Sequence, residues 1–357
     1  MRTLRGAVVG YGFIASRGHV PAYLQSGAAG DRARFDVVAV ADVTPARLAV
    51  AAQDVPSAKL YEDWRTLLER EAKDLDFVDV TVPPSMHAEV THAALDLGLH
   101  VLCEKPLART RDEARGMLTH AQSASRVLYP CHNYKHAPVV RAVRGMLDEG
   151  SIGDVSLVTL QTFRSTHAKG VKEWNTDWRR QRKYAGGGIA MDHGSHTFYL
   201  AFDWLRGHPK SVSARSWTLG PHDTEDNLSC SVTFDRGVAT AHLSWTAGVR
   251  KVIYTLHGDR GSIRVEDDAI ELSLMTRTSE GDRWEQQQRS VSSSWMDASH
   301  TAWFRAMHQQ FADAIERREF VGRELQDSYQ CVSLIEAAYA SAEARGAELM
   351  MSSLEPR

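Results

Sequence analysis

Side chains that can move a proton on and off a hydroxyl group occur in two short stretches of this sequence. In the first, Glu104-Lys105-Pro106 follows the apolar run 100–103. In the second, Asp192 and His196 follow the glycine triplet 186–188. An imidazole titrates at about pH 6.5 and can act as a general base, while an ammonium group can stabilise a developing alkoxide. The two stretches together therefore indicate acid–base chemistry on an alcohol.

The second stretch admits three interpretations. The residues after the triplet fit a helix, and on that helix Asp192 and His196 share one face because they are four positions apart. The carboxylate could then orient the imidazole and favour one tautomer. The alternatives are a surface ion pair and a zinc site in which His193 is a third ligand. Because the sequence offers no second ligand cluster, we expect no metal.

A nucleotide cofactor is indicated at the amino terminus. The apolar run 4–9 is typical of a buried strand and leads into Gly10-Tyr11-Gly12-Phe13-Ile14-Ala15, the G-x-G-x-x-A form of the dinucleotide fingerprint. Gly10 permits the tight turn, and Gly12 lets the backbone approach a pyrophosphate. The free N–H groups of the following helix, which begins near Phe13 and Ile14, would meet the phosphates.

Asp42 decides which dinucleotide we expect. It ends a second strand, 35–41, where a carboxylate would accept hydrogen bonds from the adenosine ribose and repel a 2′-phosphate. Arg47 is the competing feature, because it is close enough in sequence to offer that phosphate a partner. A helix-capping or loop role is the alternative for Asp42. The prediction is NAD, with NADP the less favoured cofactor.

The elements that position these groups alternate between strand and helix. Strands predicted at 77–82, 100–104 and 126–131, with helices between them, indicate a parallel, doubly wound Rossmann sheet. Ligands bind at the carboxyl ends of such strands. For His87 at this edge, a contact with nicotinamide or ribose competes with capping of its own helix. The predicted cofactor-binding residues are Gly10, Gly12, Phe13, Ile14, Asp42, Thr81, Pro83, His87, Glu104 and Lys105.

The pattern changes after Cys131, so we place the domain boundary there. Residues 1–131 are the expected dinucleotide-binding domain, and residues 132–357 the expected substrate-binding and oligomerisation domain. Apolar residues at helical spacing over 304–315 and 325–339 predict two late helices with core-facing stripes. A mostly antiparallel sheet, covered by helices on one face, is predicted from the strand-like runs 154–164, 210–219, 226–235, 237–246, 251–257 and 261–265. The fold class is therefore α/β.

The amino-acid composition limits the classes of binding partner that we expect. The 357 residues include 43% hydrophobic and 24% charged residues, as in an ordinary globular protein, and 42 Lys+Arg balance 45 Asp+Glu. This balance argues against a nucleic-acid partner. No run approaches the ~18 apolar residues of a membrane span, and the chain enters a strand pattern at once, so we expect a cytoplasmic protein. The four cysteines form no C-x-x-C pair and read as reduced, buried thiols.

Taken together, these motifs resemble the Gfo/Idh/MocA oxidoreductase family, which includes glucose-fructose oxidoreductase and inositol dehydrogenase. The resemblance covers nearly the whole chain. It implies a Rossmann domain joined to an α/β domain with an open, mostly antiparallel sheet. It also implies that Lys105, Asp192 and His196 line the substrate site, and that the open sheet forms a homodimer or homotetramer. The motifs that carry it are the fingerprint at 10–15, the run 81–87, Glu104-Lys105-Pro106, Trp178-Arg179 and the block 186–196.

Three departures from the family pattern concern the substrate more than the reaction. Ala15 replaces the third fingerprint glycine, a change that the family tolerates. Tyr199 stands three residues after His196, where many relatives carry an acid, and Lys135 stands where arginine is frequent. The candidate substrate-binding residues are Lys105, Lys135, His167, Trp174, Trp178, Asp192 and His196.

The leading functional hypothesis is an NAD-dependent dehydrogenase that transfers a hydride between nicotinamide and a secondary alcohol of a sugar, sugar derivative or cyclitol. His196 would remove the hydroxyl proton, Lys105 would hold or relay it and stabilise the alkoxide, and Asp192 would orient His196 or bind a neighbouring hydroxyl. One alternative is a redox-neutral enzyme that retains NAD and acts through a transient keto-sugar, giving elimination, epimerisation or glycosidic cleavage. Another is a non-catalytic NAD-dependent binding or regulatory protein.

Overall fold

The protein consists of two compact units, seen here in a computed structural model that describes Arg2–Ser292 and His300–Leu354. The first, which we call the Rossmann unit, comprises Met1–Asn133, Ala168–Gly186 and Ala298–Val332. The second, the sheet unit, comprises Tyr134–His167, Gly187–Asp297 and Ser333–Arg357. The first change of unit, after Asn133, lies close to the predicted boundary at 131. Two later segments, however, belong to the Rossmann unit, which the sequence pattern did not indicate.

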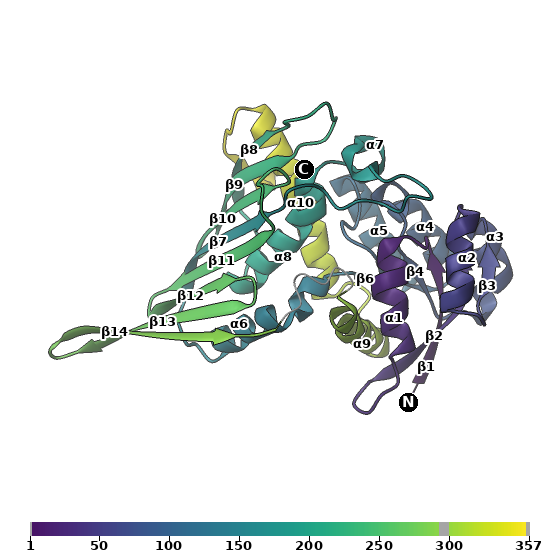
Figure 1. The fold of residues 1–357 in the computed structure, drawn as a ribbon, viewed down its shortest axis with the longest axis horizontal. Coiled ribbons are helices and arrows are strands. Elements are labelled where there is room, and N and C mark those ends of the chain that lie inside the picture. The colour runs from purple at the N-terminus through teal and green to yellow at the C-terminus, as the bar shows by residue number, and fades with distance from the viewer. Residues whose placement is uncertain (1, 293–299, 355–357) are drawn as a thin grey trace. The chain divides into compact units, whose positions relative to one another are not determined.

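The Rossmann unit contains a six-stranded sheet in the order β3-β2-β1-β4-β5-β6, with every pairing parallel. The chain order reverses between β1 and β4, which makes the carboxyl ends of these two strands the expected ligand-binding edge. The predicted doubly wound sheet is therefore confirmed (Figure 1). Its strands are β1 (Arg2–Val9), β2 (Ala33–Ala41), β3 (Lys59–Tyr61), β4 (Phe77–Val80), β5 (His100–Cys103) and β6 (Leu128–Pro130).

Local sequence signals explain where several helices of this unit begin. Thr110 caps α5, its Oγ1 accepting a hydrogen bond from the Glu113 N–H at 3.2 Å, and prolines open α2 and α4. Helix α9 packs here too: Phe304, Met307 and Phe311 belong to a core shared with β1 and β2. The helices are η1 (Ala15–His19), α1 (Val20–Leu24), α2 (Pro45–Asp54), α3 (Trp64–Glu71), η2 (Ala72–Asp74), α4 (Pro84–Asp96), α5 (Arg111–Ala124), η4 (Trp178–Arg180), α7 (Arg182–Ala185) and α9 (Thr301–Arg317).

The sheet unit is built on a nine-stranded sheet in the order β14-β13-β12-β11-β7-β10-β9-β8-β15. All pairings are antiparallel except that between β7 and β10, which matches the predicted mostly antiparallel sheet. Strands β13 and β14 were not predicted. The strands are β7 (Val155–Phe163), β8 (Ser211–Trp217), β9 (Asn227–Phe234), β10 (Gly237–Ser244), β11 (Lys251–Gly258), β12 (Gly261–Glu266), β13 (Ala269–Thr278), β14 (Gly281–Ser290) and β15 (Leu349–Met350).

Helices lie on one face of this sheet, as Figure 1 shows for α8. Val158 and Leu160 of β7 are buried on that face, and α8 itself is buried along its whole length. The helices of the unit are α6 (Pro138–Asp148), η5 (Ala190–Gly194), α8 (Ser195–Trp204) and η6 (Met351–Leu354), while η3 (Asn133–His136) and α10 (Arg323–Glu343) begin in the Rossmann unit and continue into the sheet unit.

The opposite face of the large sheet is mixed in character. Thr159 and Thr240 lie side by side on β7 and β10, where the Thr240 hydroxyl donates to Thr159 Oγ1 at 3.2 Å, and Leu157 is exposed nearby on β7. The outward positions of β7 and β10 therefore carry both polar and aliphatic side chains.

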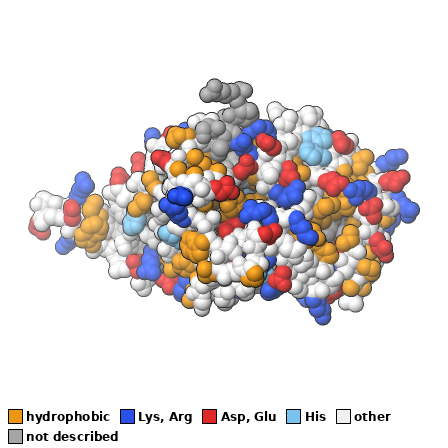
Figure 2. All heavy atoms as spheres, turned by 90° about the horizontal axis from the view of Figure 1, so that it is seen from above, with side chains coloured by type: hydrophobic (Ala, Val, Ile, Leu, Met, Phe, Trp, Pro, Cys, Tyr) orange, Lys and Arg blue, Asp and Glu red, His pale blue; other side chains and the backbone are white. Residues whose placement is uncertain are grey.

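The surface agrees with the balanced composition. Figure 2 shows acidic and basic side chains intermixed over the face in view, in line with a formal net charge of -3. Within the described residues, the helices are all too short or too polar to cross a bilayer.

Candidate functional site

The fingerprint turn between β1 and η1 contains two glycines with different surroundings. One leaves space for a ligand, and the other packs closely against neighbouring backbone. Gly10 has φ +92°, and a Cβ there would lie 2.8 Å from the Val82 backbone nitrogen, so only glycine fits. A Cβ on Gly12 would meet nothing within 4 Å. The helix that follows includes Phe13 and Ile14 in its first turn, where N–H groups lack intrahelical acceptors. The residues present thus fit the pyrophosphate of a dinucleotide.

Asp42 lies directly after β2 and fixes the shape of this turn. Its Oδ2 accepts a hydrogen bond from the Tyr11 N–H at 2.6 Å, and its Oδ1 accepts one from the Thr44 N–H at 2.8 Å. Arg47 is buried beneath the same turn, with Nε donating to the Tyr11 carbonyl at 2.8 Å and Nη2 to Ser16 Oγ at 3.1 Å. The Arg47 guanidinium, which we considered as a phosphate partner, therefore makes hydrogen bonds to the fingerprint turn and to Ser16 instead.

The loop after β4 also lies at the predicted edge. The Thr81 hydroxyl donates to the Gly10 carbonyl at 2.5 Å, and Pro83 is the N-cap of α4. His87 is 1% exposed, with Nδ1 2.9 Å from the Pro106 carbonyl oxygen and Nε2 2.8 Å from that of Val82. It joins two loops instead of capping its helix, and its buried position does not support the predicted contact with nicotinamide or ribose.

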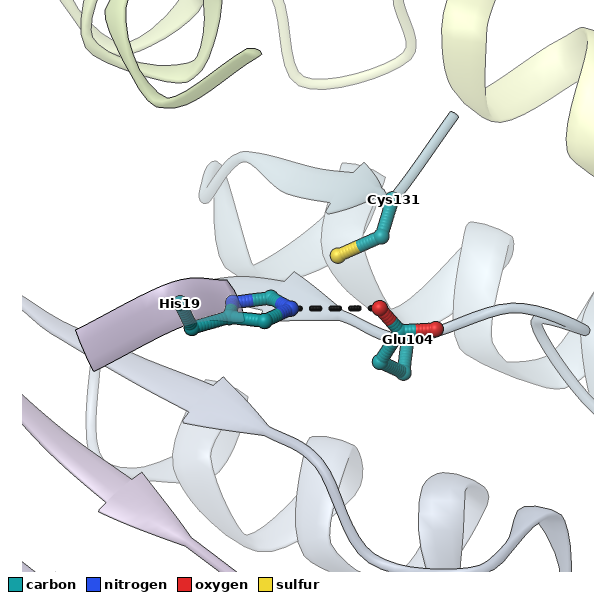
Figure 3. A group of neighbouring side chains, drawn as sticks. All are labelled: His19, Glu104 and Cys131. Atoms are coloured by element: carbon teal, nitrogen blue, oxygen red, sulfur yellow. Dashed lines mark hydrogen bonds and ion pairs between the residues drawn. The ribbon is translucent and has the colours of Figure 1, made fainter. Parts of the chain in front are cut away.

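The Lys105 turn at the end of β5 is held from inside the unit. Glu104 is buried, with Oε1 3.1 Å from Nε2 of His19, as Figure 3 shows, and Oε2 accepting a hydrogen bond from the Lys105 backbone N–H at 3.0 Å. The Lys105–Pro106 bond is cis. The Glu104 carboxylate therefore faces the interior, while Lys105 is half-buried.

In the sheet unit, His196 sits in an aromatic pocket. Its ring stacks on Tyr134, with centroids 3.9 Å apart at 14°, and its Nδ1 lies 2.7 Å from the Tyr199 hydroxyl. The Tyr134 backbone N–H also donates to that hydroxyl, at 3.2 Å. The Lys135 Nζ lies 5.5 Å from the Tyr199 ring centroid. The structure thus brings Lys135 and His196 around one tyrosine.

The structure places Tyr199 at Nδ1 of His196, while the predicted role of Asp192, to orient His196 or to bind a neighbouring hydroxyl, remains a prediction for Asp192. Its Oδ2 lies 3.1 Å from Nδ1 of His193. The physical reason is local: the segment η5 is π-helical, and the wider turn changes the phase between Asp192 and His196 from that of a regular α-helix. Tyr199 takes the orienting position at Nδ1.

The glycine triplet is explained by a residue that the sequence did not single out. A Cβ on Gly188 would lie 1.9 Å from the Glu225 carbonyl oxygen, and one on Gly187 would lie 2.0 Å from the Tyr339 hydroxyl. The buried Glu225 carboxylate accepts hydrogen bonds from the N–H groups of Gly188 and Ala190 and from the Tyr339 hydroxyl, all within 3.0 Å. Burial raises the pKa of Glu225. This carboxylate holds the start of η5, and thereby the segment that carries Asp192 and His196.

The remaining substrate candidates belong to two different units. His167 is buried in the sheet unit, its ring centroid 5.7 Å from that of Trp245. Trp174 and Trp178 belong to the Rossmann unit, where Trp174 is 40% exposed against Tyr184 and Trp178 carries Arg179 over its ring at 4.2 Å. The substrate role predicted for these three residues remains a prediction.

Comparisons with known proteins agree with this geometry. Residues 4–132 match the sequence profile of the oxidoreductase family with an NAD-binding Rossmann fold, and residues 140–264 match the profile of the GFO/IDH/MocA C-terminal domain. The chain belongs to the Gfo/Idh/MocA family. The resemblance seen in the motifs is thus confirmed, and so is the NAD cofactor expected for the first domain.

Characterised members of the Gfo/Idh/MocA family show partial similarity. Levoglucosan dehydrogenase of Pseudarthrobacter phenanthrenivorans is 28% identical over 257 residues, which are 63% of this chain and 63% of that protein. D-glucoside 3-dehydrogenase of Escherichia coli is 28% identical over 66% of this chain and 68% of its own. 1,5-anhydro-D-fructose reductase of Ensifer adhaerens is 34% identical over 53% and 56%. The aligned region thus spans somewhat under two thirds of the first of these relatives.

Solved structures share the whole fold. Levoglucosan dehydrogenase in complex with NADH and levoglucosan superposes with a TM-score of 0.85, covering 98% of this chain and 100% of that one at 23% identity. An oxidoreductase domain protein from Kribbella flavida gives a TM-score of 0.84 with the same coverage and identity. The predicted Gfo/Idh/MocA architecture is therefore confirmed.

Proposed function

We propose that this protein is an NAD-dependent dehydrogenase that transfers a hydride between nicotinamide and a secondary alcohol of a sugar or sugar derivative. The observation that carries the proposal is the geometry of the fingerprint turn. Gly10 packs against the Val82 backbone, Gly12 leaves space for a ligand, and the Arg47 guanidinium makes its hydrogen bonds to the turn and to Ser16. Family membership adds support, because the relatives described above are named dehydrogenases and a reductase of sugars.

His196 is the proposed base. An imidazole whose Nδ1 is held by Tyr199 presents Nε2 in a fixed direction, and the stacked Tyr134 ring restricts its rotation. Histidine needs little tuning to accept a proton near neutral pH. Bound NAD would supply the hydride acceptor, while His196 removes the proton from the same alcohol.

Lys105 is proposed to act on the same hydroxyl as His196. It follows a strand end whose neighbour Glu104 is fixed on both carboxylate oxygens, so the backbone from which the ammonium group projects is well defined. Its positive charge would stabilise the developing alkoxide. Asp192, held next to His193, and Lys135, next to Tyr199, would bind neighbouring hydroxyl groups of the substrate.

For the substrate, we propose a glucose-type ring whose anomeric position is blocked. Levoglucosan, D-glucosides and 1,5-anhydro-D-fructose, named for three relatives, all lack a free anomeric hydroxyl. The partner in solution is proposed to be a second copy of the chain, giving a homodimer or homotetramer through the outer face of the large sheet.

The test is NAD reduction by the purified protein with levoglucosan, methyl glucoside, glucose and myo-inositol, after any cofactor that copurifies has been measured. Accumulation of NADH with the blocked sugars, and more slowly with glucose, is the expected result. Bound NAD with substrate conversion but no net NADH would replace this proposal by a redox-neutral reaction. NAD binding without conversion of any compound would indicate a binding protein.

A further inference from the structure

A buried histidine in the Rossmann unit contacts two carboxylates at once. Nδ1 of His19 lies 2.8 Å from Oδ2 of Asp79, and its Nε2 lies 3.1 Å from Oε1 of Glu104. The His19 and Asp79 side chains are 0% exposed. His19 ends the π-helical segment η1, directly after the fingerprint turn, and Glu104 directly precedes Lys105. The contact therefore joins the fingerprint turn to the Lys105 turn through buried side chains.

The groups around His19 come from several elements of the same unit. The Tyr23 hydroxyl of α1 donates to Asp79 Oδ2 at 2.9 Å, and His308 of α9 stacks on the Tyr23 ring at 4.1 Å. Phe304, also on α9, has its ring centroid 4.3 Å from that of His19. The Cys131 thiol after β6 faces the same cluster (Figure 3).

Charge within this cluster favours an imidazolium at His19. Burial alone would lower its pKa, but the charge and hydrogen bonding of Asp79 and Glu104 outweigh burial and raise it to about 9. For Glu104, burial would raise the pKa, yet the His19 contact lowers it. If His19 lost its proton, two buried carboxylates would flank a neutral ring, which is strongly unfavourable in a medium of low dielectric constant.

The same three side chains, His19, Glu104 and Cys131, offer donor atoms within 4.8 Å of one another and could in principle ligate a metal ion. A metal needs an imidazole lone pair and a thiolate. Both nitrogens of His19 instead lie within 3.1 Å of carboxylate oxygens, and burial raises the pKa of the Cys131 thiol well above its usual value. The arrangement suits protons on His19 better than a metal.

We propose that His19 is a positioning residue for Lys105, acting through Glu104. The ion pair fixes Oε1 of Glu104, which leaves Oε2 directed at the Lys105 backbone N–H and so fixes the turn that carries the ammonium group. This inference rests on the role proposed above for Lys105. A displacement of about 1 Å in a reacting group can cost ~100-fold in rate, so such a support is mechanistically relevant.

The test compares His19→Gln, Glu104→Gln and the double variant with His132→Gln as a matched control. His132 is also buried in the Rossmann unit, with Nδ1 2.7 Å from Oε2 of Glu324. Each protein is labelled with an amine-reactive acetylating ester over a range of pH, and the labelling of Lys105 is followed by peptide mass spectrometry. Thermal midpoints are recorded in parallel. This readout requires no substrate, so it stands apart from the test of the proposed function.

We expect His19→Gln and His132→Gln both to lower the thermal midpoint, but only His19→Gln to shift the pH at which Lys105 is half-labelled. In His19→Gln the Glu104 carboxylate loses its contact with the imidazolium, so its negative charge would act on the nearest cationic group. The double variant removes that charge and retains an amide oxygen for the Lys105 N–H, so it should restore the labelling profile. If His19→Gln does not fold, His19→Asn gives the same comparison.

Two results would overturn the proposal. One is an unchanged Lys105 labelling profile in folded His19→Gln or His19→Asn, which would make the cluster a stability element only. The other is a nitrogen-15 NMR spectrum in which wild-type His19, identified by its absence in the variant, carries a single proton near neutral pH. Zinc retained by the wild-type protein and lost from His19→Gln would count as the same refutation and indicate a metal site.

Discussion

The hydroxyl of Tyr199 lies 2.7 Å from Nδ1 of His196, and it also accepts the backbone N–H of Tyr134. In the family pattern that the motifs resemble, an acid is frequent at the position of Tyr199. A phenol is uncharged near neutral pH, whereas a carboxylate would favour the imidazolium form. The proposed base is therefore oriented at Nδ1 by a hydroxyl group.

Two substitutions at Tyr199 separate orientation from charge. Tyr199→Phe should lower kcat about fivefold, as expected from the loss of one hydrogen bond of roughly 1 kcal/mol. Tyr199→Asp should raise the pKa of His196 and move the acidic limb of the kcat/KM profile to higher pH, because the base must be neutral. Tyr254→Phe, which removes another buried hydroxyl of the sheet unit, is the control. Identical pH profiles for wild type and Tyr199→Asp would exclude this role.

Asp42 should determine the preference for NAD over NADP. Asp42→Asn keeps a side chain that can accept a hydrogen bond in the turn but removes the charge that repels a 2′-phosphate. We expect the ratio of kcat/KM for NADP to that for NAD to rise at least about tenfold, equivalent to 1.4 kcal/mol, and Asp42→Ala to relax the preference as well. Steady-state kinetics with both cofactors provide the measurement. An unchanged ratio in both variants would remove the assignment.

Lys105 and His196 should behave as one catalytic unit. Lys105→Ala and His196→Ala are each expected to reduce turnover at least ~100-fold, with little change in NADH affinity measured by fluorescence. Residues that act on the same transition state give non-additive losses, so the double variant should be scarcely slower than either single one. Near-normal turnover in either folded single variant would place the base elsewhere, with Lys135 and His167 the next candidates.

His100 should make the protein less stable in mild acid. Its Nδ1 accepts the Val127 N–H at 3.0 Å, and burial, followed by the charges of Arg126 and Arg2, lowers its pKa to about 4. Between about pH 6.5 and about 4 the unfolded chain therefore binds a proton that the folded chain does not, so stability falls as the pH falls through this window. Urea midpoints across that range should fall less steeply for His100→Gln than for wild type.

The control for the acid effect is His257→Gln, which removes an exposed histidine of β11. Its urea midpoints should follow the wild-type slope. Equal slopes for wild type and His100→Gln would contradict the assignment.

Self-association is expected through the outer face of the nine-stranded sheet. Sedimentation of the wild-type protein at micromolar concentration should show a dimer or tetramer. Thr240→Arg, at the centre of this face, should shift the population towards the monomer, whereas Asp96→Arg on α4 of the Rossmann unit should not. A monomeric wild-type protein would refute the expectation.

Motifs with a fixed spacing could be read from the sequence. The fingerprint at 10–15 and the strands that end at Asp42 and Glu104 lie where predicted, because short-range turn chemistry and strand periodicity determine them. The spacing of Asp192 and His196 also indicated a site in this segment, and that role remains a prediction; the π-helical turn between them has no signature in a sequence read as an α-helix.

Long-range partners could not be read in this way. His19, Asp79 and Glu225 are single polar residues whose partners are distant along the chain, and their importance depends on burial that only the fold establishes. Strand β14 escaped prediction for the opposite reason. Its residues are exposed throughout and, apart from Gly281 and Trp284, polar, so it shows no hydrophobic alternation, and its register is provided by pairing with β13.

The glycine triplet bears on how this protein could be re-engineered. Gly187 and Gly188 are pressed against Tyr339 and Glu225, so a mutant library randomised there would consist mostly of misfolded chains. Lys135 is a better position for diversification, because it lies on η3, outside the segment that the triplet supports, and next to Tyr199. A screen for new sugar specificities should therefore leave the triplet untouched and vary Lys135.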